Sequence, residues 1–197
     1  MTGHQPSDSE ILASLPDRPE AMGVLYERHA AAVFRYLARR AGPSTAEDLL
    51  SEVFIAALDG GTRVVAHESG SALPWLYGIA MNVLRRNFRQ KSARRVAAQD
   101  PEMDWDAVDA RLDAEAKREQ LRSALNVLSH HDRELLLLVA WEGLTPAEAA
   151  EVLGIGKVAA RSRLHRARRR ALQALDCGVP NRPAVEMTAA TGKEMPA

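Results

Sequence analysis

The stretch LTPAEAAEVLGIGKVAARSRLHRARRR, residues 144–170, decides the fold of this chain. Its first part carries a helix-start signal, because Thr145 and Glu148 have the Thr-x-x-Glu spacing of a capping box. Gly154 and Gly156 then permit a sharp turn of the backbone. The pattern predicts a helix, a glycine-bounded turn and a second helix, which is the layout of a helix-turn-helix unit.

The second helix of this unit is expected to bury a narrow apolar stripe and to expose a basic surface. Apolar residues recur every three or four positions, at Ala160, Leu164, Ala167, Ala171 and Leu175. The segment 157–170 also holds seven cations and no acidic residue: Lys157, Arg161, Arg163, Arg166, Arg168, Arg169 and Arg170. Like charges one turn apart repel each other, and a solvated face usually mixes both signs. A bound polyanion such as nucleic acid is therefore favoured over a merely solvated face.

The composition favours an all-α protein with one large domain or two small ones. Of the 197 residues only 5% are aromatic, and apolar residues recur mostly at helical spacing. The single Cys177 excludes an intramolecular disulfide framework and a multi-cysteine zinc site. No stretch reaches the roughly 20 apolar residues of a membrane span, and the first ten residues lack the pattern of a signal peptide. A cytoplasmic location is expected.

The net charge is zero, but the charges are sorted into blocks. Residues 82–95 hold six Arg and Lys and no acid, whereas residues 96–115 hold seven acidic residues and one arginine. An acidic run of this kind is typical of a flexible linker. We therefore expect two small helical domains, at residues 20–95 and 112–176, joined by an acidic linker at 96–111. A disordered tail is expected at 177–197.

Helix signals divide each half of the chain further. The N-terminal half is predicted to hold three bundled helices: 20–41, ending at Gly42-Pro43; a second opened by a capping box of Ser44 and Glu47 and ending at Gly60-Gly61; and a third beginning near 72–74. The C-terminal half is predicted to begin with a helix at 112–128. Ser129 then caps a short helix at 134–141 that supports the helix-turn-helix.

Three motifs in this order resemble the extracytoplasmic-function sigma factors of bacterial RNA polymerase. They are AEDLLSEVFIAAL at 46–58, PWLYGIAMNVLRRNFR at 74–89 and LTPAEAAEVLGIGKVAARSRLHRAR at 144–168. A helix-turn-helix alone is shared by many regulators, but the three motifs together are specific. The resemblance implies a sigma factor that binds core RNA polymerase and opens promoter DNA, without a cofactor or catalysis of its own.

The first motif corresponds to the polymerase-binding helix of that family. The resemblance assigns four residues to the contact with the largest polymerase subunits: Asp48, Leu49, Glu52 and Val53. Asp48 and Glu52 lie one helical turn apart and can form an exposed carboxylate pair, opposite a core side of Leu50, Phe54 and Leu58. Without the resemblance, an ordinary solvated face would be the favoured interpretation.

The second motif corresponds to the part of the family that handles the minus-ten promoter element. Asn82 resembles the asparagine that helps to hold a base turned out of the non-template strand, since an amide can both donate to and accept from a base edge. Phosphate contacts are assigned to Arg85, Arg86 and Arg89. The loop 62–71 should help to form the pocket for that base, although it matches the family poorly. An ordinary surface role is the alternative for Asn82, and Trp75 is favoured as a core residue over a stacking platform.

The third motif corresponds to the part that reads the minus-thirty-five element. The resemblance places Arg161, Ser162, His165 and Arg166 at base-reading and phosphate-binding positions, and Arg163 is better placed for phosphates. Where the family commonly has Gly-Thr before this helix, the chain has Val158-Ala159 and so lacks a hydroxyl. Lys157 is expected to compensate for that loss.

The sequence allows two other function classes beside the sigma-factor interpretation. A stand-alone helix-turn-helix regulator would footprint a palindrome without polymerase. An enzyme is disfavoured, because the histidines show no metal-ligand spacing beyond His130-His131, and no phosphate-cradling glycine loop or nucleophile elbow occurs. Core RNA polymerase and promoter DNA are the expected partners, with no insertion into a membrane. The sequence leaves open the promoter, the inducing signal and whether an anti-sigma factor binds.

Overall fold

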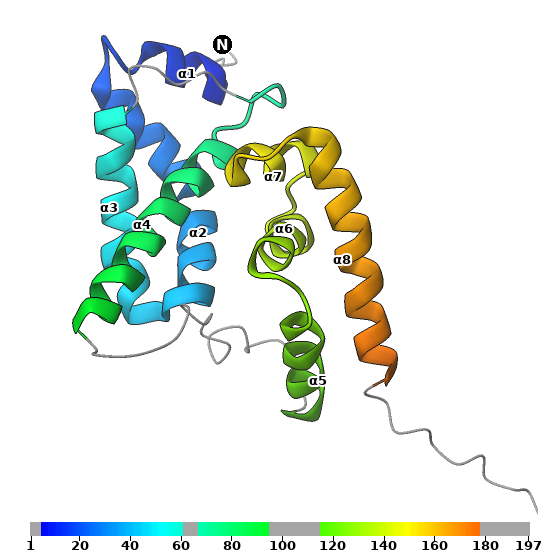
Figure 1. Ribbon diagram of the computed structural model, residues 1–197. Helices are drawn as coiled ribbons and strands as arrows, with labels where there is room; N and C mark the ends of the chain where they lie inside the picture. The colour runs from blue at the N-terminus through cyan, green and yellow to red at the C-terminus, as the bar shows by residue number, and fades with distance from the viewer. Residues whose placement is uncertain (1–4, 61–66, 95–114, 178–197) are drawn as a thin grey trace, which may run out of the picture.

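The computed structural model describes residues 5–60, 67–94 and 115–177. Within these ranges all regular secondary structure is helical (Figure 1). In chain order they are α1 (Asp8–Ser14), a 3-10 turn (Pro19–Ala21), α2 (Met22–Ala41), α3 (Pro43–Gly60), α4 (Leu73–Arg94), α5 (Glu115–Asn126), α6 (His130–Ala140), α7 (Pro146–Leu153) and α8 (Lys157–Cys177). The predicted all-α class is confirmed. The predicted linker at 96–111, the loop positions 62–66 and the tail beyond Cys177 lie outside the described residues.

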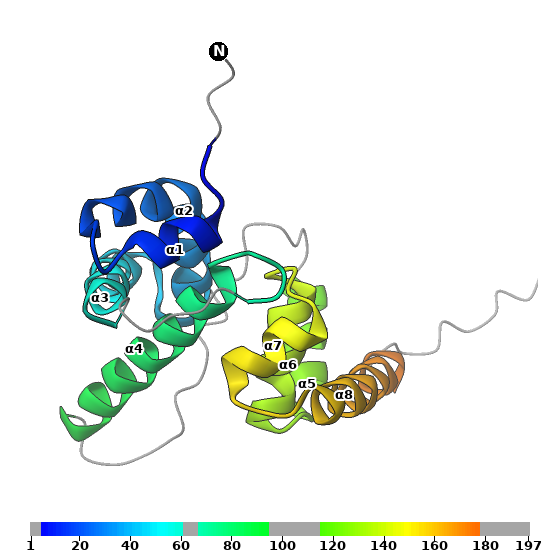
Figure 2. The ribbon, with the colours of Figure 1, turned by 90° about the horizontal axis from the view of Figure 1, so that it is seen from above.

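The helices form two groups, which we call the N-terminal bundle (α1–α4) and the C-terminal bundle (α5–α8), and the groups stand side by side in both views (Figures 1 and 2). In the N-terminal bundle α2, α3 and α4 pack on one another around buried side chains such as Leu25, Leu37 and Leu76. Burial of each such side chain stabilises the fold by roughly 1.5–3 kcal/mol. In the C-terminal bundle α8 packs against α5, α6 and α7.

Helix α1 is an element that the sequence analysis missed. Ser7 caps it and forms a reciprocal capping box with Glu10, while Ile11 and Leu12 are buried against the rest of the bundle. The N-terminal bundle therefore extends beyond the predicted start at residue 20. Seven residues give only two turns, which is too short for a clear apolar periodicity.

The start of α3 differs from the prediction. Gly42 has a φ of 80° between α2 and α3, and Pro43 occupies the first helical position, where its missing N–H costs nothing. Ser44 therefore lies inside the helix, and the predicted capping box with Glu47 is wrong. Likewise α6 begins directly after its Ser129 cap, four residues earlier than expected.

The helix-turn-helix is confirmed in detail. The Thr145 side chain caps α7, and the Thr145 N–H donates to the Glu148 carboxylate at 2.7 Å. Gly154 closes α7 in the left-handed conformation, with a φ of 65°. The Ile155 N–H donates to the Ala150 carbonyl at 2.9 Å, so the turn is fixed by the helix that it terminates.

The two bundles touch through α2 and α4 on one side and α6 and α7 on the other (Figure 2). One continuous cluster of buried apolar side chains runs through both bundles, including Leu84 of α4 and Leu138 of α6. Across the three described ranges, none of the helices combines the length and the apolar character needed to traverse a lipid bilayer.

Candidate nucleic-acid interface

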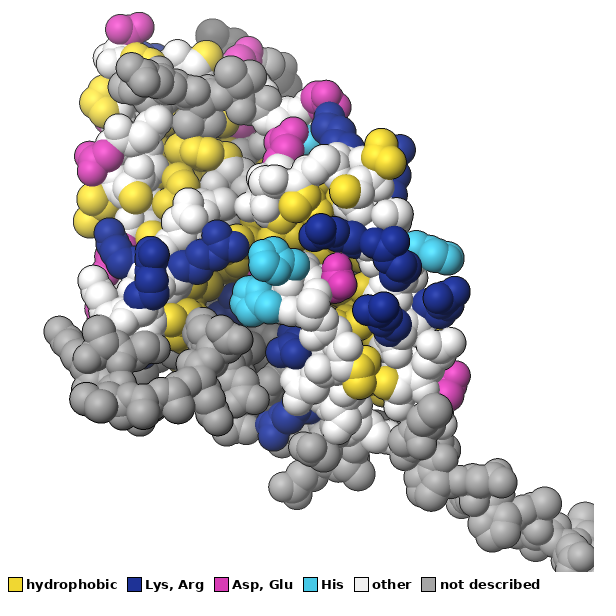
Figure 3. All heavy atoms as spheres, viewed as in Figure 1, with side chains coloured by type: hydrophobic (Ala, Val, Ile, Leu, Met, Phe, Trp, Pro, Cys, Tyr) yellow, Lys and Arg dark blue, Asp and Glu magenta, His cyan; other side chains and the backbone are white. Residues whose placement is uncertain are grey.

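Helix α8 is held along the apolar stripe that the sequence predicted. Ala160, Leu164, Ala167 and Ala171 are all buried against the neighbouring helices. This packing turns the predicted contact residues outward: Lys157, Arg161, Ser162, His165 and Arg166 are exposed and Arg163 is half-buried. Lys and Arg side chains gather over α8 in the space-filling view (Figure 3).

The length and support of α8 suit insertion into a DNA groove. Its 21 residues extend over about 30 Å at 1.5 Å per residue, and its first turns carry the exposed Arg161 and His165. The B-DNA major groove admits one α-helix, in which arginine can grip guanine through two hydrogen bonds. Because α7 is locked by its capping box and by Gly154, the direction of α8 is fixed before any ligand binds.

A hollow beside α8 places the start of α6 next to the arginines of α8. It has a volume of about 830 Å³ and is lined by Arg163, Arg166 and Arg170 together with Ser129, His131 and the acidic Asp132, among other residues. The sequence does not predict the contribution of α6, because nothing local links Ser129 and His131 to the arginines of α8. Among the described residues, no group of three His, Cys, Asp or Glu side chains could hold a metal ion.

The outer side of α4 carries the second set of predicted contacts. Asn82, Arg85, Arg86 and Arg89 are exposed, whereas Ala80, Val83 and Leu84 between and beside them face the core. Lys and Arg side chains over α4 lie on the same face of the molecule as those over α8 (Figure 3). The structure thus presents both predicted DNA-contacting sets to solvent.

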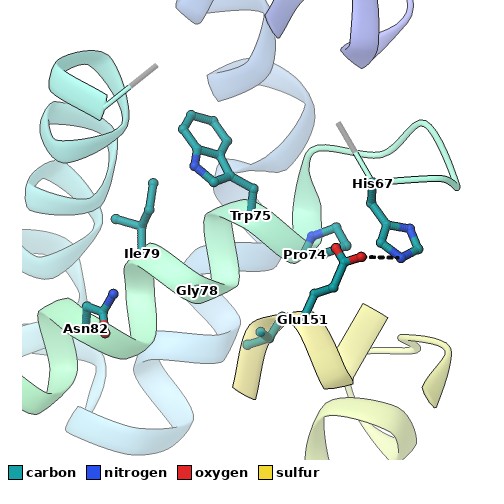
Figure 4. Close-up of a pocket in the computed structure, with 8 residues that line it drawn as sticks. His67, Pro74, Trp75, Gly78, Ile79, Asn82 and Glu151 are labelled. Carbon is teal, nitrogen blue, oxygen red and sulfur yellow. Dashed lines mark ion pairs between the residues drawn. The ribbon is translucent and has the colours of Figure 1, made fainter. Parts of the chain in front are cut away.

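Asn82 lines a pocket of about 460 Å³ between α4 and α7 (Figure 4). Trp75, Ile79 and Asn82 follow one another along α4 at helical spacing, and Glu151 of α7 lies on the far side. Trp75 is partly buried and packs against the core, while part of it lines this pocket. It therefore serves as a core residue and also as a wall of the cavity next to Asn82.

The end of the loop before α4 is bound to the helix-turn-helix. The Ser69 hydroxyl donates to the Glu148 carboxylate at 2.7 Å, His67 lies 3.5 Å from Glu151, and the Lys157 ammonium donates to Glu68 at 2.9 Å. Burial raises the pKa of Glu148, but the hydrogen bonds from Ser69 and Thr145 lower it more, so its pKa lies below the usual range. In this arrangement a loop predicted to read one promoter element touches the unit predicted to read the other.

The predicted polymerase-binding residues separate into two kinds. Asp48 is exposed and Glu52 is half-exposed, so both carboxylates are accessible on α3. Leu49 and Val53 are only 1% and 0% exposed, while Leu58, expected in the core, is 45% exposed. The buried side of α3 is therefore rotated relative to the predicted core of Leu50, Phe54 and Leu58. Leu49 and Val53 help to fix the orientation of α3, and their contact with polymerase stays a prediction.

Glu52 also pairs with Arg86 of α4. A residue predicted to touch polymerase and one predicted to touch DNA are thus neighbours on the surface. Exposed pairs of this kind contribute at most about 1 kcal/mol, so either partner can be drawn away by a ligand at little cost.

A polar cluster between the bundles was not predicted at all. Glu142, whose side chain is 3% exposed, accepts from Arg39 at 2.5 Å and lies 3.6 Å from Arg40. Arg40 also donates to Glu134 at 3.2 Å, and the Tyr77 hydroxyl donates to Glu142 at 3.4 Å. Burial, and next the Glu142 carboxylate, raise the pKa of the Tyr77 phenol. Partners more than 60 residues apart carry no local signal in the sequence.

Comparison with known proteins agrees with this geometry. The protein-family model of sigma-70 region 2 matches residues 25–94, and the family model of sigma-70 region 4 matches residues 118–170. The ECF RNA polymerase sigma factor SigL of Mycobacterium tuberculosis is 32% identical over 164 residues, covering 78% of this chain and 90% of SigL. RNA polymerase sigma factor YlaC of Bacillus subtilis is 31% identical over 153 residues, covering 73% and 86%.

Two solved structures are also similar. CnrH, solved in complex with the cytosolic domain of CnrY, is 25% identical with a TM-score of 0.57, and the match covers 86% of this chain and 98% of CnrH. The sigma factor RpoE of Bartonella quintana, solved with the anti-sigma factor NepR, shares the fold at 21% identity and a TM-score of 0.51, over 81% of this chain and 97% of RpoE.

Proposed function

Because the chain belongs to the ECF sigma factors, which direct RNA polymerase to promoters and initiate transcription, we propose how its two bundles divide that work. The N-terminal bundle, at residues 20–95 together with α1, binds core polymerase and opens the minus-ten element. The C-terminal bundle, at residues 112–176, reads the minus-thirty-five element. The segment between them, at 96–111, links the two.

The observation that carries the proposal is the surface of α8. A buried alanine and leucine stripe fixes the helix, and the opposite side presents Arg161, Ser162, His165 and Arg166 to solvent. Direct readout requires a rigid helix with donors toward base edges, whereas phosphate contacts only position the protein. We assign Arg161 to a base and Arg169 to a phosphate.

Substitution of these two arginines separates the roles. Arg161→Ala should lose preference at one upstream base pair, at a cost of about 1–3 kcal/mol. Arg169→Ala, the matched control, should weaken binding to all promoters equally. It should also reduce the slope of log affinity against log salt concentration by about one. Holoenzyme binding to a set of single-base promoter variants measures both. An equal loss on every variant for Arg161→Ala would make it a phosphate contact.

Polymerase binding is assigned to Asp48 and Glu52, since these are the accessible members of the predicted set. The double substitution Asp48→Arg with Glu52→Arg should abolish co-purification with core polymerase while the circular dichroism spectrum stays unchanged, because both changes reverse charge on an exposed face. Glu27→Arg, an exposed charge reversal on α2, is the control and should bind core normally. Wild-type recovery of the double variant would refute the assignment.

Strand opening is assigned to Asn82, supported by its exposed position on α4 beside the pocket that Trp75 lines. Asn82→Ala should still form a closed complex but should open the minus-ten region more slowly, as followed by permanganate reactivity of unpaired thymines. Arg85, Arg86 and Arg89 then hold phosphates of the opened strand.

The proposed role needs no catalysis by this chain, since polymerase performs the chemistry, and it places the chain with polymerase in the cytoplasm. An anti-sigma protein is a further proposed partner, supported by the similarity to CnrH, which was solved bound to another protein. A stand-alone regulator would protect a palindrome without polymerase, so a footprint with and without core enzyme separates the two functions.

A further inference from the structure

Asp8 of α1 is a buried carboxylate outside the segment that matches the region 2 model. Its residue is 9% exposed, although it lies in the first turn of a short helix near the N-terminus. A buried carboxylate is costly unless it is paired and hydrogen-bonded. Its partners therefore show what holds it there.

Both carboxylate oxygens of Asp8 are used. One accepts from the Arg28 guanidinium at 2.9 Å. The other lies 2.6 Å from Nε2 of His29 and accepts the backbone N–H of Ala72 at 3.0 Å. Burial raises the pKa of Asp8, but the Ala72 N–H, Arg28 and His29 together lower it more. Asp8 thus joins α2 to a backbone atom 64 residues away.

Ala72 is the last residue before α4 and is fully buried. Residues 67–70, just before it, form a tight turn, in which the Gly70 N–H donates to the His67 carbonyl at 2.7 Å and Gly70 has a φ of 76°. The neighbouring Ser9 of α1 donates to the Gly70 carbonyl at 3.5 Å. Helix α1 therefore holds the end of this loop at two backbone positions, one of them through a carboxylate at the N-terminus of α4.

We propose that Asp8 is a positioning residue for promoter reading: it fixes the loop 67–72 and the first turn of α4 in the conformation that receives the opened strand. The inference rests on the proposed function of α4. Asp8 itself does not contact DNA. It acts through the Ala72 N–H, which fixes the end of the loop and the start of α4, and so the positions of Trp75 and Asn82. The second attachment of the loop, to Glu148 and Lys157, comes from the C-terminal bundle, whereas Asp8 belongs to the same bundle as α4.

The test uses full-length protein with core polymerase and a promoter library randomised over both elements, read by sequencing the transcripts. Asp8→Ala should flatten base preference in the minus-ten element by about tenfold and leave the minus-thirty-five preference and core affinity unchanged. Asp8→Asn should give a smaller loss, because its amide oxygen still accepts from Ala72 but cannot pair with Arg28. Glu20→Gln is the matched control, since Glu20 forms an exposed pair with Arg18 in the same N-terminal segment.

Hydrogen exchange provides a second measurement that does not depend on DNA. In Asp8→Ala the amides of residues 70–73 should exchange at least tenfold faster, while those of α2 and α3 keep their wild-type rates. Should Asp8→Ala fail to fold, Asp8→Asn carries the same two measurements with nearly unchanged volume.

Three outcomes overturn the proposal. Wild-type minus-ten preference in both Asp8 variants is one, and unchanged exchange at residues 70–73 is another. An equal fall of transcription on every library member is the third, because it would mark Asp8 as a purely structural residue. Asn82→Ala in the same assay separates this inference from the proposed function. If Asn82→Ala loses the minus-ten preference and Asp8→Ala keeps it, only the role of Asp8 is rejected. If Asp8→Ala loses that preference and Asn82→Ala keeps it, only the role of Asn82 is rejected.

Discussion

Glu148 shows how much one side chain can do at the residue scale. It closes the capping box of α7 through Thr145 and accepts a hydrogen bond from Ser69 of the other bundle. Its pKa is lowered in the folded protein, so its charged form stabilises the fold. That contribution is complete above the unfolded pKa of about 4.3 for glutamate and is lost as the pH falls through the folded value.

We therefore expect Glu148→Gln to be less stable than wild type at pH 7, by about 1 kcal/mol. Glutamine can still occupy the capping box, so the difference reports the charge. Urea unfolding at pH 7 and below pH 4 measures it, and the two curves should converge in acid. Glu47→Gln, at an exposed position of α3, is the control and should differ little from wild type. A gap that is equally large at both pH values would contradict the role assigned to the charge.

Single residues also mark where the sequence was sufficient and where it was not. Arg161, Ser162, His165 and Arg166 could be placed on an exposed face because the apolar stripe of α8 is regular. The exposed face of α3 was misjudged, because leucine, valine and isoleucine occur all around that helix and the period does not single out one face. Asp8 could not have been found, since its partners lie 20, 21 and 64 residues away.

At the scale of an element, the turn between α7 and α8 depends on one of its two glycines. Gly154 has a φ of 65°, which costs a residue with a Cβ about 1 kcal/mol. A Cβ at Gly154 or at Gly156 would meet no atom within 4 Å, and only Gly154 has a positive φ. The sequence suggested equal roles for both, and the structure distinguishes them.

Gly154→Ala should lower the free energy of unfolding by about 1 kcal/mol because of backbone strain alone. Gly156→Ala should be neutral or slightly stabilising, since alanine restricts the unfolded chain and meets no obstacle. Urea denaturation of the two variants measures the difference. Equal destabilisation by both would contradict the special role assigned to the positive φ of Gly154.

The helix-turn-helix was predictable because its signals are local: a cap, a glycine and a stripe within 27 residues. Helix α1 has a local signal too, the Ser7–Glu10 capping box, but its two turns show no clear apolar period, and it is held by the burial of Ile11, Leu12 and Asp8 on the bundle. The start of α3 was misplaced because Gly42-Pro43 resembles a stop signal, although proline also suits the first position of a helix.

At the scale of the whole molecule, Glu142 connects the two bundles. Arg39 and Arg40 come from α2, Tyr77 comes from α4, and Glu142 follows α6. The Arg40 guanidinium also lies 3.8 Å from the centre of the Tyr36 ring. Two cations in a site with little water need the carboxylates, because an unpaired buried charge costs several kcal/mol.

Glu142→Gln should therefore separate the unfolding of the two bundles. Calorimetry of the wild type should give a single transition, since the buried cluster couples the bundles, and the variant should give two. Its overall free energy of unfolding should fall by about 3 kcal/mol, because Arg39 and Arg40 lose a buried counter-charge while only Glu134 remains. Glu20→Gln, which breaks an exposed pair with Arg18, should leave the single transition in place. A single transition with the wild-type midpoint in Glu142→Gln would mean that the apolar contacts between the bundles hold them together without the charges.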